Sequence, residues 1–254
     1  MAQDDWKARL RLILGDEGLG RLEASRVMVL GLGGVGSNCV EALARGGVGH
    51  LVLVDRDVVE ASNINRQAVA YLSTIGLPKA EVMARIVAKI NPSCEVVALH
   101  QFLSKEDLVP TLSSLPRPDY VVDAIDTVTQ KLLVAQWCQD QGVPEISCMG
   151  GANRLNPERL RVSTIERTTG DPLCKVMRKE CRRRGIRGLK VLYSSEVPLP
   201  VGPREGTPGQ RPEKGVTLGT MSYMPPIMGQ MIAGQVIRDL TGIANPLDVQ
   251  APAS

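Results

Sequence analysis

Short apolar runs alternate with longer segments of mixed polarity in the first part of the chain, as far as Gly150. A short apolar run that stops at a glycine or a polar residue is typical of a buried strand, and a longer segment closed by Gly-Gly or Asn-Pro is typical of a helix. The pattern predicts strands over residues 27–30, 50–54, 95–99, 120–125 and 143–147, and helices over 35–45, 78–90 and 128–141. Strands that alternate with helices of this length indicate βαβ units in a parallel sheet.

The pattern differs at both ends of the chain. Residues 4–24 predict a helical N-terminal arm with Leu10, Ile13 and Leu14 on one side. After Gly150 we expect a half-exposed strand, a basic helix and a last helix, over residues 160–165, 172–184 and 226–241. The predicted fold is therefore Rossmann-like α/β, a mostly parallel sheet with helices on both faces and an antiparallel C-terminal extension.

Two segments near the C-terminus need separate interpretation. Residues 197–215 are rich in proline and glycine and predict a mobile surface loop. Residues 215–237 carry no charge and are long enough to span a bilayer, but they contain Pro225, Pro226 and several glycines. We therefore expect a loop followed by a buried helix, and no stable membrane association. The N-terminal residues include two acids and no apolar stretch, so a signal peptide is not expected.

The composition limits the function classes. The formal net charge is +3, from 30 Lys and Arg against 27 Asp and Glu, so only a local basic cluster can support nucleic-acid binding. Aromatic residues make up 3% of the chain, which disfavours base recognition by stacked aromatic platforms. The six cysteines form no CxxC pair, which disfavours a zinc ribbon. They are expected to be reduced, buried thiols of a cytoplasmic protein.

One basic cluster lies between Lys175 and Lys190, where eight basic residues accompany the single acid Glu180. Such a patch can contact several phosphates without reading base sequence. A solvated helix face is the alternative, but the small charge of the whole chain favours nucleic-acid contact. The predicted contact residues are Lys175, Arg178, Lys179, Arg182, Arg183 and Arg184.

A glycine-rich stretch follows the first predicted strand and opens a helix. Gly31, Gly33, Gly34 and Gly36 let backbone N–H groups approach a phosphate, to which the helix N-terminus adds a favourable dipole. Asp55 ends the second predicted strand, where a carboxylate can accept hydrogen bonds from ribose hydroxyls. These features alone equally suggest an NAD-binding domain, and a purely structural glycine turn is a further alternative.

A polar cluster follows the second strand. The sequence DVVEASNINRQ is followed by Lys79 in GLPKAE, and Rossmann dehydrogenases do not require such a cluster. Arginine offers a planar fork and lysine a point charge, which suit a triphosphate that extends past the glycine loop. Ordinary solvated surface charge is the alternative for Arg66 and Lys79. The predicted nucleotide-binding residues of this cluster are Asp57, Asn63, Arg66, Gln67 and Lys79.

Two carboxylates end the fourth predicted strand, in the sequence VVDAIDT. Ligands of open parallel sheets bind outside the carboxyl ends of the strands. Asp126 is thus placed to hold a Mg²⁺ ion on ATP, since Mg²⁺ prefers one or two carboxylates together with phosphate oxygens. The alternative for Asp123 or Asp126 is an N-cap of the helix that begins near Val128, and Asp126 can serve in both roles.

The motifs GLGGVGS, LVLVDRDVVEASNINRQ, GLPKAE and VVDAIDT, in this order, resemble the adenylating superfamily that includes ubiquitin-activating enzymes and the bacterial activators of molybdopterin and thiamine sulfur carriers. The stretches DPLCKVMRKECRRRGI, KVLYSSE and GTMSYMPPIMG look most like the tRNA threonylcarbamoyladenosine dehydratases of that superfamily. The chain lacks the paired CxxC motifs of the sulfur-carrier activators and has no room for the large domains of the eukaryotic enzymes.

The resemblance implies a single adenylating domain with ATP and Mg²⁺ as cofactors. Its parts are an N-terminal arm (1–24), a nucleotide-binding core (25–150) and a portion that faces substrate and tRNA (151–254). It also implies a homodimer in which Arg9, with Arg11 as the fallback, reaches the partner's ATP site, and in some relatives a cysteine desulfurase partner. By position, Asp55 binds ribose, Asn63, Arg66 and Lys79 contact phosphates, Asp126 binds Mg²⁺, and Arg66, Lys79 and Arg9 assist catalysis.

The implied reaction is the ATP-dependent cyclisation of threonylcarbamoyladenosine in tRNA, through an acyl-adenylate that releases pyrophosphate and then AMP. Three alternatives remain: an activator of a ubiquitin-like sulfur carrier, an NAD-dependent oxidoreductase and a nucleotide-sensing scaffold. Two interpretations of Cys174 and Cys181 remain open. Basic neighbours can lower a thiol pKa and permit redox chemistry, whereas an apolar stripe along the helix favours simple packing.

Overall fold

The structure is a computed structural model that describes residues 5–200 and 219–243. Its strands are β1 (Arg26–Leu30), β2 (His50–Asp55), β3 (Glu95–His100), β4 (Tyr120–Asp123), β5 (Glu145–Cys148), β6 (Leu160–Thr164) and β7 (Lys190–Ser194). They form one seven-stranded sheet in the order β3-β2-β1-β4-β5-β7-β6. All pairings are parallel except β6 with β7. The predicted α/β sheet with an antiparallel C-terminal pair is confirmed.

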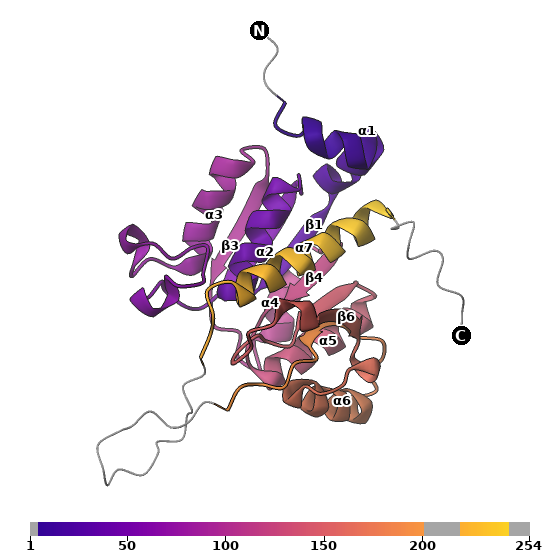
Figure 1. Cartoon of the computed structure of the whole chain (residues 1–254). Helices are drawn as coiled ribbons and strands as arrows, with labels where there is room; N and C mark the ends of the chain where they lie inside the picture. The colour runs from indigo at the N-terminus through magenta and orange to yellow at the C-terminus, as the bar shows by residue number, and fades with distance from the viewer. Residues whose placement is uncertain (1–4, 201–218, 244–254) are drawn as a thin grey trace.

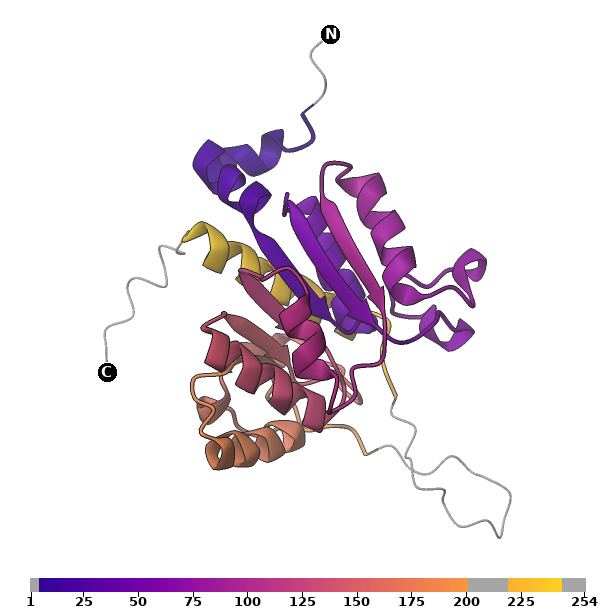
Figure 2. The ribbon, with the colours of Figure 1, turned by 180° about the vertical axis from the view of Figure 1, so that it is seen from behind.

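Helices cover both faces of the sheet (Figures 1 and 2). They are α1 (Ala8–Ala24), α2 (Gly34–Arg45), α3 (Lys79–Ile90), α4 (Leu108–Ser114), α5 (Val128–Gln141), α6 (Pro172–Arg184) and α7 (Met224–Thr241). Side chains of β1 point alternately to the two faces, as the pleat requires. Val27 and Val29 pack with buried residues of α2, α3 and α7, whereas Met28 and Leu30 pack with α4 and α5.

The part of the chain after Gly150 adds to this sheet. β7 extends the parallel sheet beside β5, and α7 returns to the face that α2 covers, where Met228 and Ile232 are fully buried. α6 packs on α5 through a smaller cluster that includes Met177 and Cys181. The basic helix is thus fixed to the sheet through α5.

Several expectations need correction. The N-terminal arm is not one straight helix, because α1 is kinked at Gly15, whose φ is +66°. Ile13 lies 77% exposed instead of sharing a buried side with Leu14, which packs on the core. β4 ends at Asp123, before the predicted end at residue 125, and neither α4 nor β7 was predicted. Of the predicted mobile loop, residues 201–215 lie outside the described part of the chain.

The uncharged segment ends in a buried helix, as predicted, since α7 begins at Met224 and packs on α2. Within the described ranges, no helix has the length and apolarity needed to cross a membrane.

The cysteines are free, and each is buried except the half-buried Cys94. Burial raises the pKa of Cys174 to about 12 and that of Cys181 to about 11. The alternative in which basic neighbours lower these pKa values is therefore wrong, and packing explains both residues.

Candidate active site

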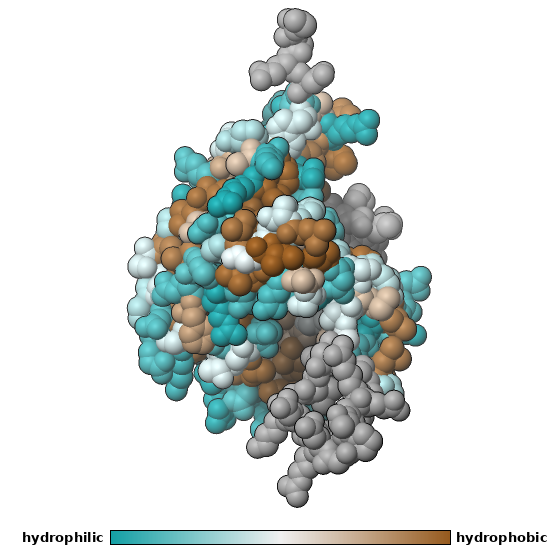
Figure 3. All heavy atoms as spheres, turned by 90° about the vertical axis from the view of Figure 1, so that its left-hand side faces the viewer, coloured by the Kyte–Doolittle hydropathy of each residue, from teal (hydrophilic) through white to brown (hydrophobic). Residues whose placement is uncertain are grey.

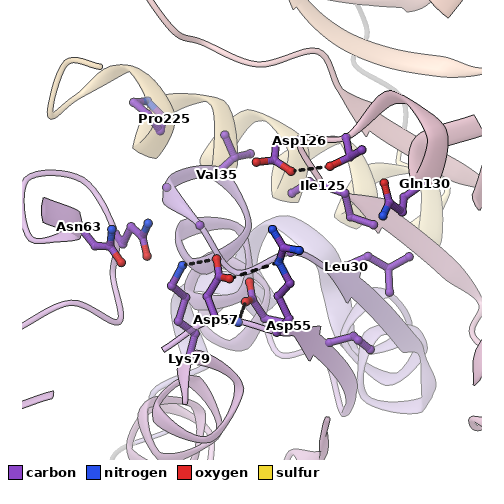
Figure 4. A pocket seen from close by; sticks show the side chains of 18 of the residues that line it. Leu30, Val35, Asp55, Asp57, Asn63, Lys79, Ile125, Asp126, Gln130 and Pro225 are labelled. Carbon is purple, nitrogen blue, oxygen red and sulfur yellow. Dashed lines mark hydrogen bonds and ion pairs between the residues drawn. The ribbon is translucent and has the colours of Figure 1, made fainter. Parts of the chain in front are cut away.

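A pocket of about 450 Å³ lies where the carboxyl ends of the parallel strands meet (Figure 4). This edge is where open α/β sheets bind ligands. The turns after β1, β2 and β4 each contribute to its wall. Of the predicted nucleotide and metal residues, those that line the pocket are Gly31, Gly33, Gly34, Asp55, Asp57, Asn63, Arg66, Gln67, Lys79 and Asp126.

The glycine loop combines a left-handed backbone with a close approach. Gly31 has a φ of +87°, which favours glycine. Gly36 is buried, and a Cβ there would lie 1.8 Å from the carbonyl oxygen of Gly31, so α2 can begin directly against the loop only without a side chain. Around Gly33, by contrast, the nearest atom to a Cβ position is 4.0 Å away. The N-terminus of α2 therefore opens into the pocket, and Gly36 shapes the loop without lining the cavity.

Asp55 ties the end of β2 to the glycine loop. One carboxylate oxygen accepts a hydrogen bond from the backbone N–H of Leu32, and the other accepts from Asp57 N at 2.7 Å. A carboxylate oxygen has two lone pairs, so each keeps capacity for a further donor. The residue lines the pocket, as a ribose-binding carboxylate must.

Lys79 lies at the start of α3 and is 5% exposed. Its Nζ lies 3.1 Å from Oδ2 of Asp57, whose Oδ1 lies 3.4 Å from Nε of Arg56 (Figure 4). The backbone N–H of Lys79 also donates to the carbonyl of Asp57, at 3.0 Å. Two cations thus share one carboxylate at this wall, which favours an anionic group beside Lys79, while Asp55, Glu60 and Asp126 place carboxylates elsewhere around the pocket.

The polar cluster after β2 is largely fixed by its own hydrogen bonds. Asn63 is buried and accepts from a backbone N–H within its turn, while Arg66 donates through NH1 to the carbonyl of Ser62 and to Oδ1 of Asn65, at 3.0 and 2.8 Å. Gln67 is buried too, and its Oε1 has no hydrogen-bond partner among the described residues. Arg66 lines the pocket with its guanidinium bonded to its own turn, where part of the side chain remains accessible to solvent.

The two carboxylates at the end of β4 differ in environment. Asp126 is exposed in the pocket, where it accepts a hydrogen bond from Thr127 Oγ1 at 3.1 Å. Asp123 is fully buried and accepts from Lys131 Nζ at 3.0 Å and from Ser147 Oγ at 2.6 Å. The N-cap position of α5 belongs to Thr127, and no side chain caps this helix. The capping alternative for Asp123 and Asp126 is therefore wrong.

Part of the pocket wall was not predicted. The segment after β3 contributes through Gln101, Phe102 and Leu103. The rule that ligands bind at the carboxyl edge of the sheet was a usable signal for them. No local signal marked the remaining contributions, because they depend on the return of the chain after β5 and before α7. These residues are Gly151, Ala152, Thr220 and Pro225, whereas Ile125 and Gln130 belong to the segment around the predicted Asp126.

The predicted trans arginine lies away from this pocket. Arg9 is exposed on α1, which leads into the amino end of β1, opposite the pocket edge (Figure 1). The fallback, Arg11, forms ion pairs with Asp5 and Asp16 on the same arm. Neither arginine lines the pocket of its own chain.

The predicted tRNA-contacting residues are together on α6, outside the pocket. Arg178 is half-buried and donates through NH1 to the carbonyl of Thr168 at 2.7 Å, and Arg183 pairs with Glu180 at 2.6 Å. Arg178 therefore helps to fix the helix in place. The remaining predicted contacts are exposed: Lys175, Lys179, Arg182 and Arg184.

The donor set fits ATP with its Mg²⁺ ion. Within residues 5–200 and 219–243, no group of three or more His, Cys, Asp or Glu side chains could hold a metal ion on its own. Mg²⁺ commonly takes one or two carboxylates and completes its shell with phosphate oxygens and water. Asp126 supplies such a carboxylate beside the glycine loop, so these residues suit a metal that arrives with the nucleotide.

This fold and pocket define a nucleotide-binding α/β protein. The chain belongs to the ThiF family, whose model matches residues 6–251. It is 39% identical over 239 residues to the tRNA threonylcarbamoyladenosine dehydratase of Bacillus subtilis (strain 168), covering 92% of this chain and 93% of that protein. The enzyme of the same name from Escherichia coli (strain K12) is 32% identical over 205 residues, covering 76% of each chain.

Solved structures agree with this assignment. The crystal structure of E. coli tRNA N6-threonylcarbamoyladenosine dehydratase, TcdA, in complex with ATP matches with a TM-score of 0.81 and 27% identity, covering 99% of this chain and 100% of that one. The resemblance drawn from the motifs is thereby confirmed.

Proposed function

We propose that this chain dehydrates threonylcarbamoyladenosine in tRNA at the expense of ATP, through an acyl-adenylate. The observation that carries this proposal is the gathering of the glycine loop, Asp55, the Lys79–Asp57 pair and Asp126 around one cavity, in a chain similar to relatives named for that reaction. In this proposal residues 25–150 supply most of the nucleotide site, and the part of the chain from residue 151 onward adds Gly151, Ala152, Thr220 and Pro225 to that site and faces the tRNA through α6. The cations Arg66 and Lys79 favour a triphosphate over a nicotinamide.

The first step joins the threonyl carboxylate to the α-phosphate of ATP and releases pyrophosphate. A carboxylate is ionised at neutral pH, so this step needs no general base. Arg66 and Lys79 neutralise phosphate charge and align the triphosphate, while Asp55 holds the ribose. Asp126 would hold a Mg²⁺ ion that arrives with the nucleotide, and such an ion would supply further charge stabilisation. In the second step a nucleophile of the same substrate side chain attacks the acyl carbon, expels AMP and closes the ring, with net loss of water.

The proposed function is tested by pyrophosphate release. The protein is incubated with ATP and Mg²⁺ and with tRNA that carries threonylcarbamoyladenosine, unmodified tRNA, or a diglycine-tailed carrier protein. We expect release only with the modified tRNA. Release only with the carrier protein would instead identify a sulfur-carrier activator, and a nicotinamide absorbance change would identify an oxidoreductase.

The exposed basic residues of α6 contact tRNA phosphates in this proposal. Reversing Arg182, Arg183 and Arg184 to Glu should weaken tRNA binding and reduce its salt dependence, because contacts to phosphates release counterions. ATP binding should stay unchanged, since α6 lies outside the pocket. Unchanged tRNA affinity in this triple variant would remove α6 from the interface.

The active form in this proposal is a homodimer in which Arg9 completes the partner's site. Leu12 and Ile13 on the same arm are 87% and 77% exposed, and exposed hydrophobic residues are visible at this end of the molecule (Figure 3). Such apolar exposure on one arm fits a contact between copies. Mixing Arg9→Ala with Asp126→Asn should restore about a quarter of wild-type activity, because random exchange gives half heterodimers with one intact site each. No recovery on mixing would contradict a trans arginine.

A cysteine desulfurase partner is the remaining expectation from the resemblance. The thiols of Cys174 and Cys181 are buried, with raised pKa values, and so are poor sulfur acceptors. A desulfurase that binds this chain therefore acts without sulfur transfer to either thiol.

A further inference from the structure

Exposed apolar side chains border the pocket where Ala152 and Thr220 line it. They belong to three segments that are distant in sequence, one after β5, one after β7 and one before α7. We call this group the rim patch. Its members are Leu155, Leu199, Met221 and Tyr223, which are 43%, 45%, 41% and 37% exposed.

Hydrogen bonds hold the backbone beneath the rim patch. The hydroxyl of Tyr223 donates to the carbonyl of Leu155, and the N–H of Leu199 donates to the carbonyl of Asn153, both at 2.8 Å. Asn153 also accepts from Gly219 N through its Oδ1 at 2.8 Å, and it has a φ of +58°. Asparagine is among the few non-glycine residues that adopt this conformation readily. The three segments are therefore joined by hydrogen bonds at Asn153, which fixes the backbone that carries the exposed apolar side chains.

The rim patch also adjoins the basic helix. Arg154, between Asn153 and Leu155 in the chain, forms a buried ion pair with Asp171. Asp171 in turn caps α6 by accepting from Cys174 N at 2.7 Å. The start of α6 is therefore tied to the segment that carries Leu155. The rim patch is thus connected to the N-terminal end of α6, and its segments also carry the pocket-lining residues Ala152 and Thr220.

The chemistry of the substrate requires a surface of this kind. In threonylcarbamoyladenosine the reacting carboxylate is linked to the adenine ring through the short threonylcarbamoyl group. When that carboxylate meets the α-phosphate, the base itself lies just outside the nucleotide pocket. Proteins that act on a base in RNA take it out of its stack and hold it against aromatic or apolar side chains.

We propose that the rim patch binds the extruded adenine base of the substrate nucleoside, with the Tyr223 ring as its stacking partner. This inference rests on the proposed function. The low aromatic content of the chain disfavours a platform for several bases, but one ring is enough for one base. The cations of α6 hold the RNA backbone on one side, and the pocket receives the carboxylate on the other.

Two substitutions at Tyr223 test the inference, by measurement of KM for tRNA that carries threonylcarbamoyladenosine and, separately, of the Kd for ATP. Tyr223→Phe keeps the ring and should leave the tRNA KM within about two-fold of wild type, because stacking needs only the π-face. Tyr223→Leu keeps an apolar side chain without the ring and should raise the tRNA KM about ten-fold, with the ATP Kd unchanged. Tyr71→Leu, which replaces an exposed tyrosine outside the pocket wall, is the matched control and should match wild type.

Thermal unfolding shows whether Tyr223→Leu folds as the wild type does. Where it does not, Leu199→Ser replaces it, since this change leaves the Tyr223 hydroxyl bond intact and should also raise the tRNA KM. If the folded variant has the same KM for tRNA as the wild type, the rim patch does not bind the base. The proposed function is not affected by that result. Absence of tRNA-dependent turnover in the wild-type protein overturns both.

Discussion

Two Lys–Asp pairs of nearly equal length lie at different depths of this molecule. Lys79 Nζ is 3.1 Å from Asp57 at the pocket wall, and Lys131 Nζ is 3.0 Å from Asp123 in the interior. The side chain of Asp57 is 51% exposed, whereas those of Asp123 and Lys131 are 0% and 1% exposed. The exposure of the carboxylate, more than the distance, determines what each lysine is free to do.

At the pocket wall, water can solvate Asp57 whenever Lys79 turns toward a ligand. Lys79 is itself buried, but a phosphate would replace Asp57 as its anionic partner while water solvates the exposed carboxylate, so redirecting the ammonium costs little. Arg56 remains beside Asp57 to balance its charge. The pair keeps Lys79 oriented without holding it permanently.

In the interior, Lys131 cannot leave Asp123 for another partner in this way. Asp123 accepts from Lys131, from Ser147 and, through its second oxygen, from the backbone N–H of Ile125 at 3.0 Å. The last of these bonds shapes the turn that carries Asp126 into the pocket. The buried pair therefore supports the turn that carries Asp126.

The largest effect is expected from breaking the interior pair. Lys131→Met leaves Asp123 buried without its cation and should lower the free energy of unfolding by about 3–5 kcal/mol. Denaturant titration measures this loss. The double variant Asp123→Asn/Lys131→Met removes both charges and should recover most of it. If the free energy of unfolding of Lys131→Met is within about 1 kcal/mol of wild type, the buried pair is not a structural support.

The corresponding change at the pocket wall should have little effect on stability and a large effect on activity. Lys79→Met should cost about 1 kcal/mol of stability or less, because its partner stays solvated. Pyrophosphate formation should fall about a hundred- to a thousand-fold, as expected when a group that stabilises transition-state charge is lost. Steady-state kinetics and denaturant titration on the same preparation separate the two effects. An inactive variant that is also severely destabilised would show that Lys79 is structural.

A smaller effect on stability, which depends on pH, is expected from Glu145 beside the buried Lys131–Asp123 pair. Glu145 lies beside Asp123 and Lys131, and burial followed by the charge of Asp123 raises its pKa well above the ordinary value. The unfolded chain ionises this carboxyl above about pH 4.5, whereas the folded protein releases the proton only at higher pH. Stability contributed at low pH is therefore lost as the pH rises, by up to about 1.4 kcal/mol per unit. Glu145→Gln should gain stability over wild type progressively above that pH, and a pH-independent difference would contradict this.

Sequence reasoning reached the glycine loop, Asp55, Lys79 and Asp126 because strand ends and glycine spacing are local signals. The alternation of apolar runs likewise located the core strands within a few residues. The carboxyl-edge rule then grouped residues that are distant in sequence, such as Gly31 and Asp126, into one pocket.

What sequence reasoning missed depends on tertiary contacts. Nothing local distinguishes Asp123 from Asp126, because only packing decides that one is buried against Lys131 while the other faces the pocket. Thr220 and Pro225 join the wall only through the return of α7 onto α2. The exposure of Ile13 follows from a kink at Gly15 that an apolar pattern does not reveal.

The proposed reaction joins a substrate carboxylate to AMP in this pocket. Labelling of the carboxylate oxygens with ¹⁸O follows this bond. Threonylcarbamoyladenosine tRNA carrying ¹⁸O in the threonyl carboxylate is turned over with unlabelled ATP, and the AMP is analysed by mass spectrometry. An acyl-adenylate that is opened by ring closure must leave one carboxylate oxygen on the phosphorus, so we expect one ¹⁸O atom in each AMP. AMP without the label, formed during turnover of the tRNA, would contradict the account.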